Sequence, residues 1–161
     1  MNVNELRKYW ESVEKEAKIK GWDFSHIEGK FEQCELPWDF SEIIHRYMHD
    51  TDRILDIDTG GGEFLLSLGH PCSLTSATEG YPPNVELCRR KLGELGIDFH
   101  EMNDYSAMPF ADEQFDVVLD RHGAYDADEV YRVLKHGGYF ITQQVGEEND
   151  RELVELLLLK S

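Results

Sequence analysis

The sequence predicts an α/β fold, in which a mostly parallel sheet lies between two layers of helices and is preceded by N-terminal helices. Two observations support this prediction. From residue 53 onward, short runs rich in β-branched and aromatic residues alternate with stretches of helical periodicity. In addition, a β-branched strand runs directly into three glycines and then into a helix. Strand–helix alternation at this spacing forms βαβ units with right-handed crossovers, and hence a parallel sheet.

The expected strands are 53–58, 73–78, 98–102, 115–119 and 139–145, and the helices between them are 62–69, 83–95 and 126–135. Apolar residues at helical spacing also predict an amphipathic helix from residue 4 to about residue 20, which we expect to pack on the core or to cover a site. Ser41 suits the N-cap of a second helix that ends near residue 50. A last helix is expected over 149–159.

The length and charge of the chain restrict its class. At 161 residues a single domain is the default, and we divide it into an N-terminal helical extension, 1–52, and a nucleotide-binding core, 53–161. Sixteen basic against 33 acidic residues give a net charge of -17, which repels a phosphate backbone. We therefore expect a small-molecule substrate and no nucleic-acid partner.

Cysteine spacing and hydropathy indicate the compartment. The three cysteines are widely spaced and form neither a CxxC pair nor a zinc-spaced set with histidine, so no disulfide framework and no metal site are expected. The N-terminus has no apolar core of signal-peptide length, and no stretch approaches the roughly 18 apolar residues that span a bilayer. A reducing, cytoplasmic location without membrane contact is expected.

The most informative segment runs from Arg53 to Leu65, where a strand meets three glycines and then a helix. Glycines let the chain turn tightly and let a ligand approach the backbone, while the N–H groups of the helix face that ligand. A plain strand-to-helix turn is the alternative for the glycines alone. Glu79 strengthens the ligand interpretation, because a carboxylate at the end of the second strand accepts both ribose hydroxyls of an adenosine. The same spacing between the glycine loop and the acidic residue also serves nicotinamide cofactors, so these residues identify an adenosine-type ligand before they identify a reaction.

These segments resemble the motifs of class I S-adenosylmethionine-dependent methyltransferases. Leu-Asp-Ile-Asp-Thr-Gly-Gly-Gly at 55–62 is similar to the first motif of that family, and Glu79 is similar to its ribose-binding acid. Residues 103–110 resemble the segment along the adenine, with an aspartate in the place of the acid that meets its exocyclic amine. Residues 115–122 resemble the fourth strand, and 129–138 resemble the helix and turn before the fifth.

The resemblance implies a Rossmann-like fold, S-adenosylmethionine as cofactor, and methyl transfer to a small-molecule acceptor. It also implies a set of cofactor-binding residues: Asp56, Asp58, Thr59, Gly60, Gly61, Gly62, Glu79, Gly80, Tyr81, Asn103, Asp104, Tyr105, Asp120 and Arg121. If a base takes part, His122 is the catalytic candidate, because it lies just past the fourth strand and histidine titrates near neutral pH. A loop histidine with a packing role is the alternative. From their positions, Trp10 and Trp38 are candidates for a lid over the site.

Two departures from the family pattern concern the site and the sheet. Asp58 stands where the family has glycine, and its carboxylate either repels the carboxylate of the ligand or points away. The family's sheet normally continues with two further strands, and here the chain ends first, so we expect the fifth strand to have an open edge. Open edges recruit partners, which predicts a homodimer through that edge.

These departures keep a second function open. A noncatalytic, methyltransferase-like protein that binds the cofactor weakly and acts through protein contacts is the alternative to the enzyme. A nicotinamide-dependent oxidoreductase is a third interpretation. It is weakened because Leu65 stands where the dinucleotide fingerprint requires its third glycine.

Overall fold

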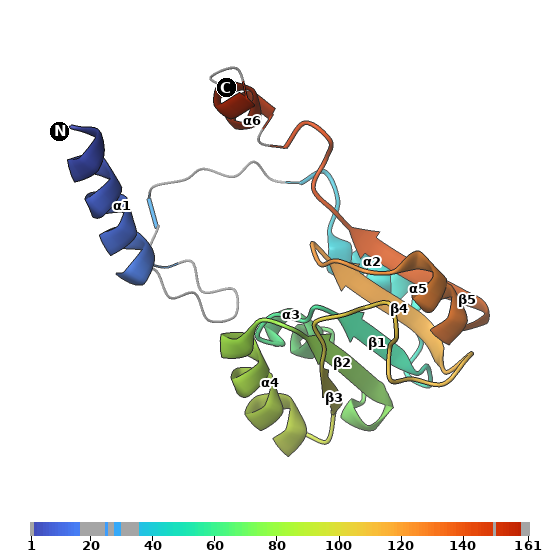
Figure 1. Ribbon diagram of the computed structural model, residues 1–161. Helices are drawn as coiled ribbons and strands as arrows, with labels where there is room; N and C mark the ends of the chain where they lie inside the picture. Colours follow the sequence, from blue (N-terminus) through green and yellow to red (C-terminus); the bar gives the residue numbers. More distant parts are fainter. Residues whose placement is uncertain (1, 17–24, 26–27, 30–35, 150, 159–161) are drawn as a thin grey trace.

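The computed structural model describes residues 2–16, 25, 28–29, 36–149 and 151–158 (Figure 1). Five strands form one sheet in the order β3-β2-β1-β4-β5. Their bounds are β1 Ile54–Ile57, β2 Thr75–Glu79, β3 Asp98–Glu101, β4 Phe115–Arg121 and β5 Leu134–Gln143. All four pairings between these strands are parallel. The expected α/β class and parallel sheet are therefore confirmed.

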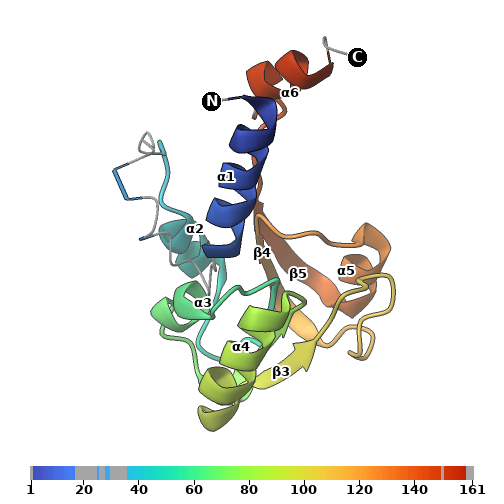
Figure 2. The same cartoon turned by 60° about the vertical axis from the view of Figure 1, so that its left-hand side comes forward.

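Helices cover both faces of the sheet, which confirms the three-layer arrangement. The helices α3 (Glu63–Ser67) and α4 (Pro82–Glu94) lie on one side, and α5 (Ala127–Val133) lies on the other (Figure 2). The helices α3 and α4 lie in the connections from β1 to β2 and from β2 to β3, so there the chain moves toward one edge of the sheet. The helix α5 connects β4 to β5, so there the chain moves toward the opposite edge. Right-handed crossovers in opposite directions along the sheet place their helices on opposite faces.

A hydrophobic core lies on each face of the sheet. On one face, side chains of α3 and α4 pack against β1, β2 and β4 in a cluster that includes Leu65, Leu92, Ile54, Ala77 and Val117. On the other face, α5 and the loop after β3 cover β1 and β4 in a second cluster that includes Val130, Phe110, Leu55, Ile57 and Val118. The central strands β1 and β4 are thus covered on both faces, as is typical of parallel sheets, and both cores hold the strand ends that carry the site.

The helix α2 (Phe40–Tyr47) belongs to the first of these cores. Its cap is Asp39, whose side chain accepts a hydrogen bond from the Glu42 backbone N–H at 3.1 Å. The expected N-cap at Ser41 is therefore wrong by two residues, because the carboxylate of Asp39 satisfies the first turn. Phe40 and Ile44 are buried against the sheet, and α2 thereby lies beside the carboxyl end of β5.

The strand β5 begins five residues earlier than expected. The helix α5 ends at Val133, and Leu134 already pairs with Phe115 of β4. The next pair in register joins Val117 to Tyr139, so the intervening residues of β5 form a bulge. A side chain at Gly138 would lie 2.7 Å from the backbone oxygen of Asp116, which requires glycine there. Gly137 and Gly138, which we expected to form a turn before the fifth strand, are therefore part of β5.

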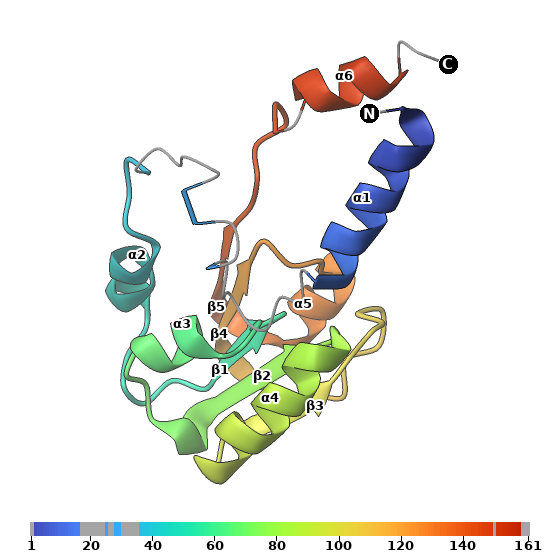
Figure 3. The same cartoon turned by 90° about the vertical axis from the view of Figure 1, so that its left-hand side faces the viewer.

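The terminal helices are α1 (Val3–Glu16) and α6 (Arg151–Leu158), which lie away from the sheet in Figure 3. The apolar stripe of α1 is exposed, with Trp10 61% and Val13 44% accessible, so the expected packing of this stripe on the core is not observed. The predicted end of this helix near residue 20 lies outside the described residues. None of the helices in the described part of the chain is long and apolar enough to cross a bilayer.

Candidate functional site

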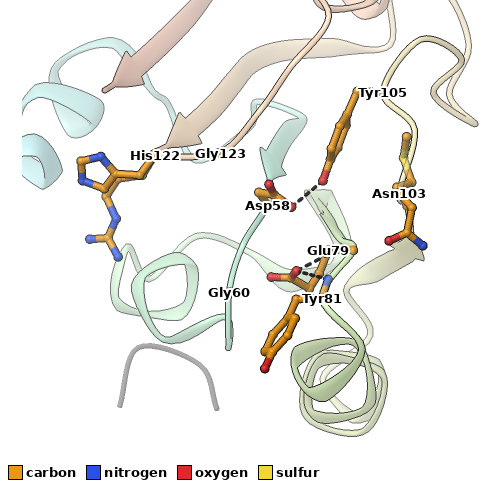
Figure 4. Close-up of a pocket in the computed structure, with 11 residues that line it drawn as sticks. Asp58, Gly60, Glu79, Tyr81, Asn103, Tyr105, His122 and Gly123 are labelled. Atoms are coloured by element: carbon orange, nitrogen blue, oxygen red, sulfur yellow. Dashed lines mark hydrogen bonds between the residues drawn. The ribbon is translucent and has the colours of Figure 1, made fainter. Parts of the chain in front are cut away.

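A cavity of about 340 Å³ opens at the carboxyl ends of the strands, where β1 lies between β2 and β4 (Figure 4). The chain leaves β1 toward one side of the sheet and returns to β4 on the other, and ligands of open α/β sheets bind at such a switch point. The lining residues are Asp58, Gly60, Glu79, Gly80, Tyr81, Met102, Asn103, Tyr105, Arg121, His122 and Gly123.

The glycine-rich loop after β1 adopts left-handed backbone at alternate positions, with φ of 55° at Asp58, 65° at Gly60 and 75° at Gly62. Two residues of the helix α4 contact this loop and hold it in place. The Cys88 thiol donates to the Gly60 carbonyl oxygen at 3.0 Å, and a Cβ at Gly62 would lie 2.8 Å from the Leu92 side chain. The loop is therefore both tight and clamped, which presents its backbone to the cavity.

Glu79, the last residue of β2, is buried and held in one orientation. Its Oε1 accepts hydrogen bonds from the backbone N–H groups of Gly80 and Tyr81 at 2.8 and 2.7 Å (Figure 4). Its Oε2 accepts from the Asn84 amide at 3.4 Å. Gly80 has no room for a side chain, since a Cβ would lie 2.3 Å from the Met102 carbonyl oxygen. A fixed carboxylate at a strand end is suited to accept hydrogen bonds from a pair of ligand hydroxyls.

Asp58 lies on the cavity wall and accepts a hydrogen bond from the Tyr105 hydroxyl (Figure 4). Burial raises the pKa of Tyr105, and this bond to Asp58 raises it further, so the phenol keeps its proton. The space for Asp58 exists because residue 123 is glycine, where a Cβ would lie 2.6 Å from the Asp58 Cβ. The carboxylate does not point away from the cavity, and a cationic ligand group suits it better than an anionic one.

Two further carboxyl groups lie beneath the cavity. Asp56 is 4% exposed, and burial raises its pKa to about 7. Asp120 is fully buried, and burial together with the charge of Asp58 raises its pKa. Asp120 Oδ1 accepts from the Gly123 N–H at 2.9 Å, which fixes the turn that follows β4. The attraction of Arg121 partly offsets the cost of burying Asp56.

His122 occupies the end of the site farthest from Asn103 (Figure 4). Its backbone is left-handed, with φ of 66°, and its N–H donates to the Gln143 carbonyl oxygen at 2.9 Å. Burial and the neighbouring charge of Arg121 lower the pKa of His122, so the imidazole is neutral at pH 7. A neutral imidazole can accept a proton, as a general base must.

The structure brings most of the predicted site residues together. Nine of them line the cavity: Asp58, Gly60, Glu79, Gly80, Tyr81, Asn103, Tyr105, Arg121 and His122. Asp56 and Thr59 line a small recess beside it, together with Asp58, Phe64 and Arg121. Gly61 and Gly62 belong to the loop, and Asp120 lies beneath it. Asp104 lies outside the lining set and is exposed, and its Oδ1 accepts from the Ser106 N–H and hydroxyl at 2.9 and 2.7 Å.

Two lining residues, Met102 and Gly123, were missed from the sequence. Met102 is the last residue of the predicted strand 98–102, and Gly123 directly follows the candidate His122. The rule that sites form at the carboxyl ends of strands would therefore have included both. Among the described residues, no three potential metal ligands gather in one place. Cys72 and Cys88 are free thiols, and Cys34 lies outside the described part of the chain.

The fold and the cavity define a Rossmann-like domain with a site for an adenosine-type ligand. Residues 55–142, more than half of the chain, match the family described as a methyltransferase domain, and the protein belongs to that family. The cofactor that this membership implies is S-adenosylmethionine. The observed residues fit it, because Glu79 offers a fixed acceptor for ribose hydroxyls and the glycines at 60 and 80 leave the backbone accessible.

Curated relatives are similar to this chain in sequence, and solved structures are similar to it in fold. Phthiotriol/phenolphthiotriol dimycocerosates methyltransferase 1 of Mycobacterium ulcerans is 32% identical over 108 residues, which cover 61% of this chain and 39% of the relative. Demethylmenaquinone methyltransferase of Deinococcus radiodurans is 30% identical over 115 residues, which cover 65% and 47%. The fold is similar to the YcgJ protein of Bacillus subtilis, with a TM-score of 0.56 at 23% identity over 74% and 56% of the chains. The chain thus spans less than half the length of these curated relatives.

Proposed function

We propose that this protein transfers a methyl group from S-adenosylmethionine to a small-molecule acceptor. The observation that carries the proposal is the buried Glu79 carboxylate, fixed at the end of β2 and facing a glycine-lined cavity in a methyltransferase-family chain. When bound, S-adenosylmethionine supplies a methyl group on a positively charged sulfur, which leaves as a neutral thioether.

The residues of the chain then contribute binding, orientation and charge. Glu79 would accept the ribose hydroxyls, and Tyr81 and Asn103 line the same cavity and would contact the rest of the nucleoside. Asp58 places a negative charge on the cavity wall, which favours a cationic ligand group nearby. His122, neutral at pH 7, is placed to accept the proton that an acceptor loses. Such a mechanism depends mainly on proximity and electrostatics.

A small acceptor agrees with the charge of the chain and with the names of the two relatives described above, which are at least 30% identical to it. A net charge of -17 disfavours nucleic acid, since it repels phosphate. The named relatives act on demethylmenaquinone and on phthiotriol or phenolphthiotriol dimycocerosates, which are not polypeptides or nucleic acids. The noncatalytic alternative has less support, because the family match and the clamped loop are both retained.

The proposal is tested by calorimetric titration of S-adenosylhomocysteine into the wild type and two variants. Glu79→Gln keeps the shape of the side chain and removes its charge. Glu101→Gln is the matched control, because Glu101 pairs in register with Glu79 on the adjacent strand and is exposed. Charged hydrogen bonds contribute about 1.5–3 kcal/mol, so we expect roughly 10- to 100-fold weaker binding for Glu79→Gln. Equal weakening in both variants, or in neither, would contradict the assigned role.

We also propose that two copies associate through the outer edge of β5. Among the described strands β5 pairs only with β4, and residues 137–145 contain no charged side chain. A two-fold axis would pair two such edges antiparallel. Light scattering should then give twice the chain mass of 18.7 kDa. Tyr139→Lys should lower this mass, whereas Tyr131→Lys on the exposed face of α5 should not; a wild-type monomer at high concentration refutes the dimer.

A further inference from the structure

A second pocket, of about 240 Å³, lies between α2 and the carboxyl end of β5. Its walls are Trp38, Phe40 and Ile43 on one side and residues 141–144 on the other. We call it the acceptor pocket. None of its lining residues carries a charge, in contrast to the cofactor cavity with its carboxylates and guanidinium. In a chain of net charge -17, an uncharged recess of this size is suited to an uncharged ligand.

A row of hydrogen bonds joins the acceptor pocket to the cofactor cavity. The Trp38 indole Nε1–H donates to Gln143 Oε1 at 3.1 Å, and Gln143 Nε2 lies 3.2 Å from His122 Nε2. Trp38 and Gln143 line the acceptor pocket, whereas His122 lines the cofactor cavity. These three residues form a wall that the two sites share, and this wall includes His122, the predicted catalytic candidate.

A second row of contacts forms the rest of this wall. The Phe40 and Phe64 rings stack with their centroids 5.7 Å apart, and the Arg121 guanidinium lies 4.1 Å from the centroid of the Phe64 ring. Phe40 lines the acceptor pocket and Arg121 lines the cofactor cavity. Side-chain contacts at two places thus connect the lining of one site to the lining of the other.

The first row determines the proton position on His122. An indole nitrogen only donates, so the Gln143 oxygen must face Trp38 and the Gln143 amide N–H must face His122. His122 Nε2 then accepts this bond, and the ring proton lies on Nδ1. The lone pair of His122 consequently points toward the acceptor pocket. The lowered pKa of His122 is consistent with this neutral ring.

We propose that the acceptor pocket binds the methyl acceptor as an uncharged aromatic molecule with a hydroxyl group, and that this hydroxyl replaces the Gln143 amide at His122 Nε2. The inference rests on the proposed function and names its substrate class. The oxygen lone pair forms the bond to the methyl carbon, the electron pair of the broken carbon–sulfur bond stays on sulfur, and the hydroxyl proton passes to His122 Nε2. A cavity of about 150 Å³ holds benzene, so 240 Å³ accommodates one substituted or two fused rings.

The test uses 2-naphthol as an uncharged probe and 2-naphthoate as a charged probe with the same rings. Both are titrated into the full chain while the indole N–H signals of its three tryptophans are followed by ¹H–¹⁵N NMR, with Trp38→Phe identifying the signal of Trp38. We expect 2-naphthol to shift this signal in a saturable way and 2-naphthoate to bind at least about tenfold more weakly, because its carboxylate would be desolvated without a partner. Equal binding of the two probes would overturn the uncharged class.

Two lysine variants locate the binding. Ile43→Lys places an ammonium in the acceptor pocket, and Glu42→Lys places the same group on the adjacent, exposed position of α2. We expect at least about tenfold weaker 2-naphthol binding in Ile43→Lys only, with unchanged S-adenosylhomocysteine binding and retained thermal unfolding transitions in both. If S-adenosylhomocysteine binds but 2-naphthol leaves the Trp38 signal unchanged, the acceptor pocket is refuted while the proposed function stands. If S-adenosylhomocysteine does not bind, the proposed function fails and the acceptor assignment fails with it.

Discussion

Asp56 makes the stability of the protein depend on pH in a direction that can be calculated. Its carboxyl is buried under the cofactor cavity, and burial raises its pKa from 3.8 to about 7. The folded state therefore binds the proton more tightly than the unfolded state does. The resulting free-energy penalty is absent below the unfolded pKa, grows as pH rises from about 4, and is complete above about pH 7. Asp56→Asn removes it.

The magnitude follows from these two pKa values. Between pH 5 and pH 8 the linkage relation gives a change of about 2–3 kcal/mol in the unfolding free energy of the wild type relative to Asp56→Asn. The unfolding free energy of Asp56→Asn therefore increases relative to that of the wild type as pH rises. Carboxylates far from residue 56 cancel in this difference, because both proteins share them, whereas the nearby Asp58 and Asp120 interact with Asp56 and contribute to it.

Urea unfolding at pH 5, 6, 7 and 8, followed by circular dichroism, measures this difference. Asp50→Asn, at an exposed position, controls for the loss of one charge from an acidic chain. We expect the gap between Asp56→Asn and the wild type to widen with pH, and the gap for Asp50→Asn to stay constant. A gap for Asp56→Asn that is the same at pH 5 and pH 8 would refute the assignment of a buried, proton-binding carboxyl.

Three further changes test the supports of the site. Arg132 donates five hydrogen bonds to the loop that carries Tyr105 and to its own helix, and Arg132→Lys loses this fork. We expect the melting temperature to fall by about 2–4 °C for each kcal/mol lost, and an unchanged value would contradict this role. Gly80→Ala places a Cβ 2.3 Å from the Met102 carbonyl oxygen and should cost about 1–3 kcal/mol in urea unfolding; wild-type stability would show that the strand ends are not this close. Tyr105→Phe removes the donor to Asp58 and should cost about 1–2 kcal/mol by the same method, whereas a stabilised variant would indicate that the bond is not formed.

The sheet and most of the cofactor cavity were predictable from local sequence signals. Strand–helix alternation and a glycine loop act over a few residues, and parallel topology follows from the crossover rule. For the same reason Glu79 and Asn103, each at or just past a strand end, meet in one cavity although 24 positions separate them. The start of β5 was not predictable, because the bulge at 135–138 depends on how Leu134 and Tyr139 register against β4.

The orientations of polar side chains were also beyond the sequence. Whether Asp58 faced the cavity depended on the Tyr105 hydroxyl, which lies 47 positions further along the chain. The role of Trp38 depended on Gln143, which is 105 positions away and shows no motif of its own. Such contacts depend on tertiary packing, which neither periodicity nor spacing encodes.

The most direct measurement for the central claim is a calorimetric titration of S-adenosylhomocysteine and, separately, NAD into the wild-type chain. If the cavity beside Glu79 is a methyl-donor site, S-adenosylhomocysteine should bind once per chain in the micromolar range and NAD should give no measurable binding. Tighter binding of NAD, or no binding of either ligand by folded protein, would contradict the account.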